Sequence, residues 1–476
     1  MSVLIRDTGL HAVGVKTRIP FRYGIATLTE APYVFVSVDA VVDGHEQRGV
    51  AADVLPPKWF TKKPDAPIED ELAEMKAVVR QACAHAVEVA PAPTVFDFWM
   101  ALYRKQDAWG AEQGMPPLLS GFGASLVERA LIDAFCHVSG LALAEALRRN
   151  AFGVNLGAIH ESLHGAEPVD FLSPPRRRVG ARHTVGLADP LTEDVIPPEE
   201  RLHDGLPQSL QACIDRYGLS YFKIKVPADE TQAVERLRQI AHVTQANARR
   251  PAFTLDGNEF FHDVGAFREL WTALNADPEV AAFFQQGLLL VEQPLHRDAA
   301  LTGAVKEALA AWKDRPPLII DESDGSLDSL PQALACGYNG TSHKNCKGVF
   351  RGVANACLLE QRRRAEPNAD YLMTGEDLMN VGPVALLQDL AVAAALGVEH
   401  VERNGHHYVR GLSAFPRELQ NAVLSAHGDL YHEVEADSET FASLAISEGE
   451  ILLDSVIDAP FGYAMPLDVT AFEPLV

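Results

Sequence analysis

Between residues 183 and 402, short apolar runs alternate with longer stretches in which apolar residues recur every three or four positions. The short runs predict strands and the longer stretches predict helices. Strands that alternate with helices at this spacing form parallel βαβ units, and eight units in one series favour a closed barrel over an open sheet. The predicted strands are 183–187, 221–226, 252–256, 287–292, 317–321, 340–344, 370–374 and 398–402. The predicted helices are 231–244, 264–275, 298–312, 327–336, 351–364 and 382–396.

The sequence on either side of this series has a different texture. A β-branched and aromatic run at 33–38 predicts a strand, and the apolar spacing at 69–87 and 126–138 predicts helices with one buried face. Residues 150–207 are rich in proline, glycine and charge, which is typical of an insertion loop, and the arginine run within it is expected to be solvated. We therefore expect four parts: an N-terminal α+β domain at 1–150, a linker at 151–182, a barrel at 183–428, and a C-terminal segment at 429–476 that folds back onto the N-terminal region.

Charged residues stand at the ends of five predicted strands, although buried parallel strands are normally apolar throughout. Side chains alternate between the two faces of a strand, so Lys223 and Lys225 share one face and their apolar neighbours share the other. The apolar face is expected to meet the helices, which leaves the lysines in the mouth of the barrel. The same alternation points these residues of the next four strands inward: Thr254, Asp256, Leu290, Glu292, Ile319, Asp321, Ser342 and Lys344.

Three of these residues are acids that would converge at the carboxyl-terminal edge of the barrel, where the active sites of such barrels lie. At about 4 Å and an effective dielectric of about 20, each unscreened pair of carboxylates costs about 4 kcal/mol. Asp256, Glu292 and Asp321 therefore either take up protons or hold a cation. Oxygen ligands with room for water and substrate suit Mg²⁺ better than Ca²⁺. No histidine or cysteine ends these strands to select zinc.

The lysines complete a chemical hypothesis. Lys225 and Lys344 come from strands separated by three others, so we expect them on opposite sides of the barrel mouth. A lysine beside another ammonium and a divalent ion has its charged form disfavoured, and its pKa is expected to fall toward the range of a base. A substrate carboxylate bound between the two would offer its α-proton to one of them, and Lys223 would help to stabilise the enolate.

Composition narrows the class of partner. The 476 residues include 41 Lys and Arg against 65 Asp and Glu, which gives a formal charge of −24. Such a chain repels nucleic acid and anionic membranes, which argues against both as partners. The six cysteines have no C-x-x-C pair and no zinc-ligand spacing, which predicts reduced and mostly buried thiols. The start of the chain has no signal-like apolar run, so the cytoplasm is the expected location.

Taken together, these motifs resemble the enolase superfamily and, more narrowly, its muconate lactonizing enzyme subgroup. The residues that carry the resemblance are Lys223-Ile-Lys225, Asp256-Gly-Asn258, Val291-Glu292-Gln293-Pro294, Asp321-Glu322-Ser323 and Lys344. The superfamily combines Lys or His bases with Mg²⁺. The resemblance covers nearly the whole chain and implies an α/β fold, a modified TIM barrel of (β/α)7β type with an N-terminal α+β capping domain that the C-terminal segment completes. It also implies a homo-oligomer, either a dimer or an octamer.

Carried over by position, the resemblance implies roles for single residues. Asp256, Glu292 and Asp321 are the expected metal ligands. Glu322 is the rival of Asp321, and strand alternation favours Asp321. Lys225 and Lys344 are the expected acid–base pair. Lys223 is expected to lie near the substrate carboxylate.

Two loops of the capping domain, at about 21–29 and 54–63, are expected to close over the substrate. They make Tyr23, Lys58 and Trp59 candidates for substrate specificity. Further candidates for substrate binding are Asn258, Glu376 and Arg403, with His406 and His407 next to the last of these. The arginine and the two histidines would bind a second polar part of the substrate, or else be solvated.

The expected reaction is Mg²⁺-dependent proton abstraction α to a small carboxylate, followed by racemization, epimerization, cycloisomerization or β-elimination. The chain would thus be an isomerase or a lyase. The seventh strand lacks the histidine of a His–Asp dyad, and the eighth lacks a D-x-D pattern for an amino group. Three alternatives stay open: an acid-sugar dehydratase of the same superfamily, a Schiff-base enzyme acting through Lys344, and a catalytically silent ligand-binding homologue.

Overall fold

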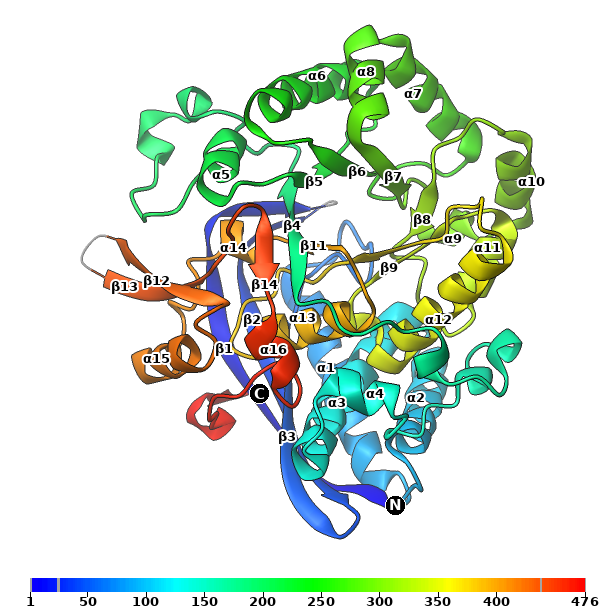
Figure 1. Ribbon diagram of the computed structural model, residues 1–476, viewed down its shortest axis with the longest axis vertical. Helices are drawn as coiled ribbons and strands as arrows, with labels where there is room; N and C mark the ends of the chain where they lie inside the picture. The colour runs from blue at the N-terminus through cyan, green and yellow to red at the C-terminus, as the bar shows by residue number, and fades with distance from the viewer. Residues whose placement is uncertain (1, 24–25, 437–438, 476) are drawn as a thin grey trace.

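The computed structural model describes residues 2–23, 26–436 and 439–475. Its centre is a ring of eight parallel strands in sequence order, closed by the pairing of β11 with β4 (Figure 1). The expected closed α/β barrel is therefore confirmed. Its strands are β4 (Arg178–Val185), β5 (Tyr221–Lys225), β6 (Ala252–Asp256), β7 (Leu288–Glu292), β8 (Leu318–Ile320), β9 (Gly340–His343), β10 (Leu372–Gly375) and β11 (His400–Arg403).

The first barrel strand starts earlier than the predicted strand 183–187. β4 begins at Arg178, inside the predicted linker 151–182, because β14 (Glu450–Leu452) pairs antiparallel with its first residues. The guanidinium of Arg178 also donates to Glu450, 272 residues away, at 2.8 Å. A partner so distant in sequence leaves no trace in the local pattern, which here is dominated by proline and arginine.

Helices surround the strands, as the alternating pattern predicts (Figure 1). One of the helices that the pattern did not predict is α8 (Pro278–Gly287). Asp277 caps it by accepting the N–H groups of Glu279 and Val280, and proline occupies its first position. The other helices around or beyond the barrel are α5 (Leu210–Tyr217), α6 (Glu230–Asn247), α7 (Val264–Ala276), α9 (Arg297–Ala300), α10 (Gly303–Ala311), α11 (Ser329–Cys336), α12 (Val349–Ala365), α13 (Ala385–Ala395), α14 (Gly405–Tyr408) and α15 (Arg417–Ala426).

The N-terminal part is an antiparallel sheet covered by helices. Its strands are β1 (Val3–Tyr23), β2 (Ala26–Val42) and β3 (His45–Val54), and its longer helices are α1 (Ile68–Glu88), α2 (Val95–Glu112) and α3 (Pro117–Ser139). The C-terminal segment returns to this sheet through β15 (Glu473–Pro474), which pairs with β1. Since β14 pairs with the barrel, the C-terminal segment joins both parts. No helix in the described ranges has the length and apolarity that crossing a membrane requires.

The ends of β6 and β7 approach each other closely, and this approach brings Asp256 and Glu292 together. Asp256 ends β6 and is followed by Gly257, whose N–H donates to the carbonyl of Glu292 at 2.9 Å. A Cβ at Gly257 would lie 2.5 Å from the Cα of Pro294. The absence of a side chain at Gly257 therefore lets the ends of β6 and β7 meet.

We predict that Gly257→Ala lowers the free energy of unfolding by about 1–3 kcal/mol, the usual cost of overpacking. Urea denaturation measures this change. Gly121→Ala in α3 is the matched control, because a Cβ there meets nothing within 4 Å and alanine favours a helix. A Gly257→Ala protein as stable as the wild type would contradict this account of the two strand ends.

Candidate active site

The acids expected at the barrel mouth lie together at the ends of neighbouring strands. Asp256 closes β6, Glu292 closes β7 directly opposite it, and Asp321 follows β8. All three side chains are buried. Glu292 and Asp321 form a group with Glu376, which follows β10, in which one carboxylate oxygen of each residue lies within 4.8 Å of the others. Asp256 stands beside this group and is held by lysines.

The ammonium group of Lys223 lies among four carboxylates. Its Nζ is 2.8 Å from Glu292, 2.8 Å from Glu376 and 3.1 Å from both Asp256 and Glu402. Burial lowers the pKa of Lys223, but the four carboxylates outweigh burial and raise it well above its usual value. Lys223 is therefore a fixed cation of the site.

Lys225 and Lys344 flank the acids, as the strand order predicts. Lys225 Nζ lies 2.5 Å from Asp256 and 2.9 Å from the side-chain oxygen of Asn258. Lys344 Nζ lies 2.8 Å from Asp321 and 2.5 Å from Glu376.

The pKa of each flanking lysine reflects the protein groups around it. Burial disfavours the ammonium form of both Lys225 and Lys344, but the adjacent carboxylates favour it more, so these groups alone raise the pKa of each lysine. The lowered pKa expected from the sequence concerns a site that holds a divalent ion, and it stays a prediction.

Two cations of this cluster were missed in the sequence. Lys347 Nζ lies 2.9 Å from the carboxylate of Asp321, 2.8 Å from its carbonyl oxygen, and 3.0 Å from the carbonyl oxygen of Ser342. Arg182 donates to Glu376 at 2.6 Å from the inward face of β4. Two features of the sequence could have indicated these contacts. One is the K-x-x-K spacing of Lys344 and Lys347 after β9, and the other is the inward position of Arg182 in β4.

Asp321 and Glu322, the two rivals for the third acidic position, differ in surroundings. Burial raises the pKa of Asp321, but Lys344 and Lys347 together hold it well below its usual range. Burial, and next the negative charge of Asp321, raise the pKa of Glu322 to about 8. Asp321 is thus the anionic member of the pair at neutral pH. Glu322 lines the cavity beside it.

The residues present fit a divalent cation. Glu292 is fully buried, and its Oε2 has no hydrogen-bond partner among the described residues. Burial and the neighbouring Glu376 raise its pKa well above the usual value. An orphaned carboxylate oxygen within a group of acids is the environment that a hard cation such as Mg²⁺ stabilises.

The cations of the cluster compensate its carboxylates before any ion is added. At distances of 3.1 Å or less, five carboxylates contact five cationic side chains in the described part of the chain. The carboxylates are Asp256, Glu292, Asp321, Glu376 and Glu402, and the cations are Arg182, Lys223, Lys225, Lys344 and Lys347. A sixth carboxylate, that of Asp324, lies 3.9 Å from Lys347. A divalent ion would therefore add positive charge to acids that cations of the protein already contact.

The cavity above the acids is small and is roofed by the capping domain. Its volume is about 60 Å³, enough for a few waters. The ring of Trp59 covers Lys344, whose Nζ lies 5.3 Å from the centroid of that ring. Arg297 of the barrel holds this loop by donating to the carbonyl oxygens of Trp59 and Phe60 at 2.9 and 2.8 Å.

The other candidates for substrate contact are placed differently. Lys58 lines the cavity, but its ammonium pairs with Glu71 at 3.1 Å. The side chain of Tyr23 lies outside the described residues. Arg403 does not line the cavity, because it is buried in an ion pair with Asp377.

His406 and His407 are buried, so they are not solvated, and neither lines the cavity.

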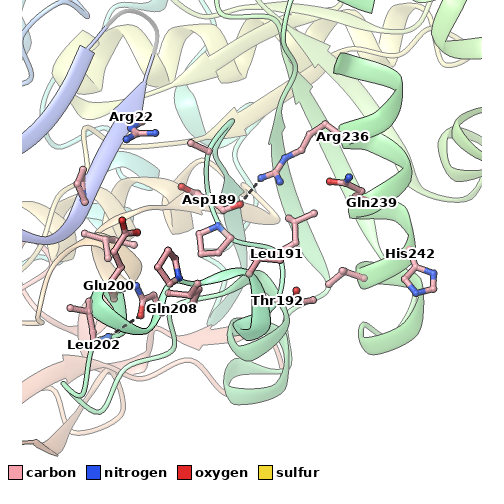
Figure 2. Close-up of a pocket in the computed structure, with 18 of the residues that line it drawn as sticks. Arg22, Asp189, Leu191, Thr192, Glu200, Leu202, Gln208, Arg236, Gln239 and His242 are labelled. Atoms are coloured by element: carbon pink, nitrogen blue, oxygen red, sulfur yellow. Dashed lines mark hydrogen bonds between the residues drawn. The ribbon is translucent and has the colours of Figure 1, made fainter. Parts of the chain in front are cut away.

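A larger groove lies away from the acids and the lysines. It has a volume of about 1090 Å³ and runs between β1, the loop at 188–208 and α6. Figure 2 shows Arg236 of α6 reaching toward Asp189, whose carbonyl oxygen it contacts at 2.7 Å. None of the cluster's carboxylates or cations lines this groove, so its size does not make it the reaction site.

No protein-family model matches the chain. A comparison with curated proteins gives no match either. Solved structures do match. A mandelate racemase/muconate lactonizing protein from Herpetosiphon aurantiacus is 15% identical, with a TM-score of 0.61 over 97% of this chain and 99% of its own. The chain has the fold of the mandelate racemase and muconate lactonizing proteins. The fold expected from the sequence motifs is thereby confirmed.

Two further structures with this fold extend the comparison. The N-succinyl Arg/Lys racemase from Bacillus cereus is 14% identical, with a TM-score of 0.56 over 96% of this chain and 97% of its own. An enolase from Bradyrhizobium, solved with magnesium and mandelic acid, is 13% identical, with a TM-score of 0.55 over 96% of this chain and 98% of its own. At these identities the likeness establishes the fold, and the chemistry is argued from the site itself.

We predict that Lys223→Met lowers the free energy of unfolding by about 3–5 kcal/mol without divalent ions, because it leaves buried carboxylates uncompensated. Mg²⁺ is expected to restore more stability to this variant than it adds to the wild type. Thermal denaturation with and without Mg²⁺ measures both effects. The control is Lys306→Met on the exposed face of α10. A Lys223→Met protein with wild-type stability and an unchanged response to Mg²⁺ would show that the acids do not depend on this cation.

Proposed function

We propose that the protein is a Mg²⁺-dependent enzyme that removes the proton α to a carboxylate of a small substrate and passes through an enolate. The observation that carries the proposal is the position of Lys225 and Lys344 on opposite flanks of one buried acid cluster. Lys225 contacts Asp256 at the end of β6, and Lys344 contacts Asp321 after β8. β7, with Glu292 at its end, lies between these two strands.

The acids supply the ligands of this site. Asp256, Glu292 and Asp321 would hold the ion, which stabilises negative charge on the enolate oxygens when bound. Lys223 adds a second fixed positive charge next to the same oxygens, because its ammonium already lies among the acids. The magnesium and mandelic acid bound to the Bradyrhizobium neighbour support this choice of ion and of substrate class.

The flanking lysines would exchange the proton with the α-carbon. A neutral amine on one flank takes the proton, and an ammonium on the other flank can return one to the opposite face. The raised pKa of each lysine shows how strongly the protein groups hold these protons. Release of one of them accordingly depends on what else neutralises Asp256 and Asp321.

Two lysines on opposite faces suit racemization or epimerization, and the same enolate allows cycloisomerization or β-elimination. Neighbours in fold that are described as an N-succinyl Arg/Lys racemase and a dipeptide epimerase support this reaction type. The rival readings gain no specific support. A Schiff-base enzyme would need Lys344 alone, whereas Lys225 stands beside the same acids on the other flank, and both lysines that a silent homologue would not need are present. The cytoplasmic location and the homo-oligomeric state stay predictions.

We predict that the protein with Mg²⁺ in D₂O exchanges the α-proton of a small carboxylate for deuterium. Lys225→Ala and Lys344→Ala are each expected to lose exchange at one stereochemical face by about 10²–10⁴-fold, the usual contribution of a positioned acid or base. NMR over a library of carboxylates measures the exchange, and Lys306→Ala serves as the control. Exchange that survives at both stereochemical faces in each lysine variant, with metal binding intact, would refute the assigned bases.

A further inference from the structure

A second set of metal-ligating side chains lies outside the barrel mouth. His183 of β4, Cys213 of α5 and His407 of α14 each place one ligand atom within 4.8 Å of the other two. Arg182 and Thr184 point into the barrel toward Glu376 and Glu402. His183 lies between them in the strand and therefore faces the outer layer, so the group is separated from the acids by the barrel wall.

One spacing within this group is close to that of a tetrahedral metal site. Cys213 Sγ and His407 Nδ1 are 3.6 Å apart. Zinc with a bond of about 2.3 Å to sulfur and about 2.0 Å to nitrogen sets these two atoms about 3.5 Å apart at the tetrahedral angle. Three protein ligands leave the fourth position for water.

All three side chains are buried, so an ion among them would be shielded from bulk water. A neutral imidazole offers a lone pair to a metal. The thiol of Cys213 would bind as a thiolate and give its proton to solvent.

A third imidazole adjoins the group. His406 Nε2 lies 3.1 Å from His183 Nδ1, which fixes the ring of His183. The other ring nitrogen of His406 is buried and has no hydrogen-bond partner in the described part of the chain. Four buried side chains of this kind in one place are more than packing requires, since apolar residues would fill the space without desolvating polar atoms.

We propose that His183, Cys213 and His407 bind a transition metal of the zinc class, distinct from the ion at the acids. The ligands come from β4, α5 and α14, so one ion would join elements that are far apart in sequence. The backbone carbonyl oxygen of His407 also accepts a hydrogen bond from the guanidinium of Arg18 in β1, at 2.9 Å. The next residue, Tyr408, packs its ring 4.3 Å from that of Phe21, which lines the cavity. The metal would therefore brace the part of β1 that covers the active site.

The test loads the full chain with Co²⁺ in the presence of excess Mg²⁺, which occupies oxygen-only sites, and then removes free metal. We expect one retained Co²⁺ per chain and a thiolate-to-cobalt charge-transfer band. Cys213→Ser is expected to lose the band, and His407→Gln to retain less than a tenth of the metal. Cys83→Ser, a buried thiol of α1, is the control and is expected to keep both.

Zn²⁺ measured by elemental analysis under the same conditions is expected to give the same stoichiometry. A wild-type protein that retains no Co²⁺ or Zn²⁺ overturns the proposal and leaves a hydrogen-bonded cluster of histidines and cysteine. A charge-transfer band that persists in Cys213→Ser also overturns it. If Cys213→Ser does not fold, His407→Gln and the wild-type measurement still decide the question.

Discussion

Charge compensation inside the barrel mouth is the constraint on which the rest of the structure depends. Five carboxylates and five cations meet in a space nearly closed to water, where an unpaired charge costs several kcal/mol. Each acid therefore has to end its strand at a level where a cation from another strand can reach it. The tight turn at Gly257 and the register of β6 with β7 serve this requirement.

The same constraint explains why the capping domain covers the acid cluster. Water admitted to the cluster would screen the interactions that hold it together. The loop after β3 covers Lys344 with Trp59, and Arg297 fastens that loop through two backbone carbonyl groups. The small cavity that remains has room for an ion and a few waters, and a larger substrate would require the loop to move.

Much of this arrangement could be predicted from the sequence, because strand alternation is a local property. The inward direction of Lys223, Lys225 and the three acids follows from parity alone, and the succession of strands and helices predicts the closed barrel. The early start of β4 could not be found in this way, since its partner β14 is 272 residues distant. The contacts of Lys347 and Arg182 were missed for the same reason, because their partners belong to other strands. The carboxylates that raise the pKa of Lys344, Asp321 and next Glu376, could not be identified together, because the position of Glu376 is set by the tertiary fold.

The most direct test of the central claim is the number of protons released when Mg²⁺ binds. Because cations of the protein already contact the acids, and because Lys223 is too deeply buried to leave the cluster, loading Mg²⁺ is expected to drive protons off Glu292 and the flanking lysines. Calorimetric titration at neutral pH in buffers of different ionisation enthalpy measures this release. The account predicts that about one proton or more leaves per ion bound. Binding of Mg²⁺ with no release of protons would contradict it.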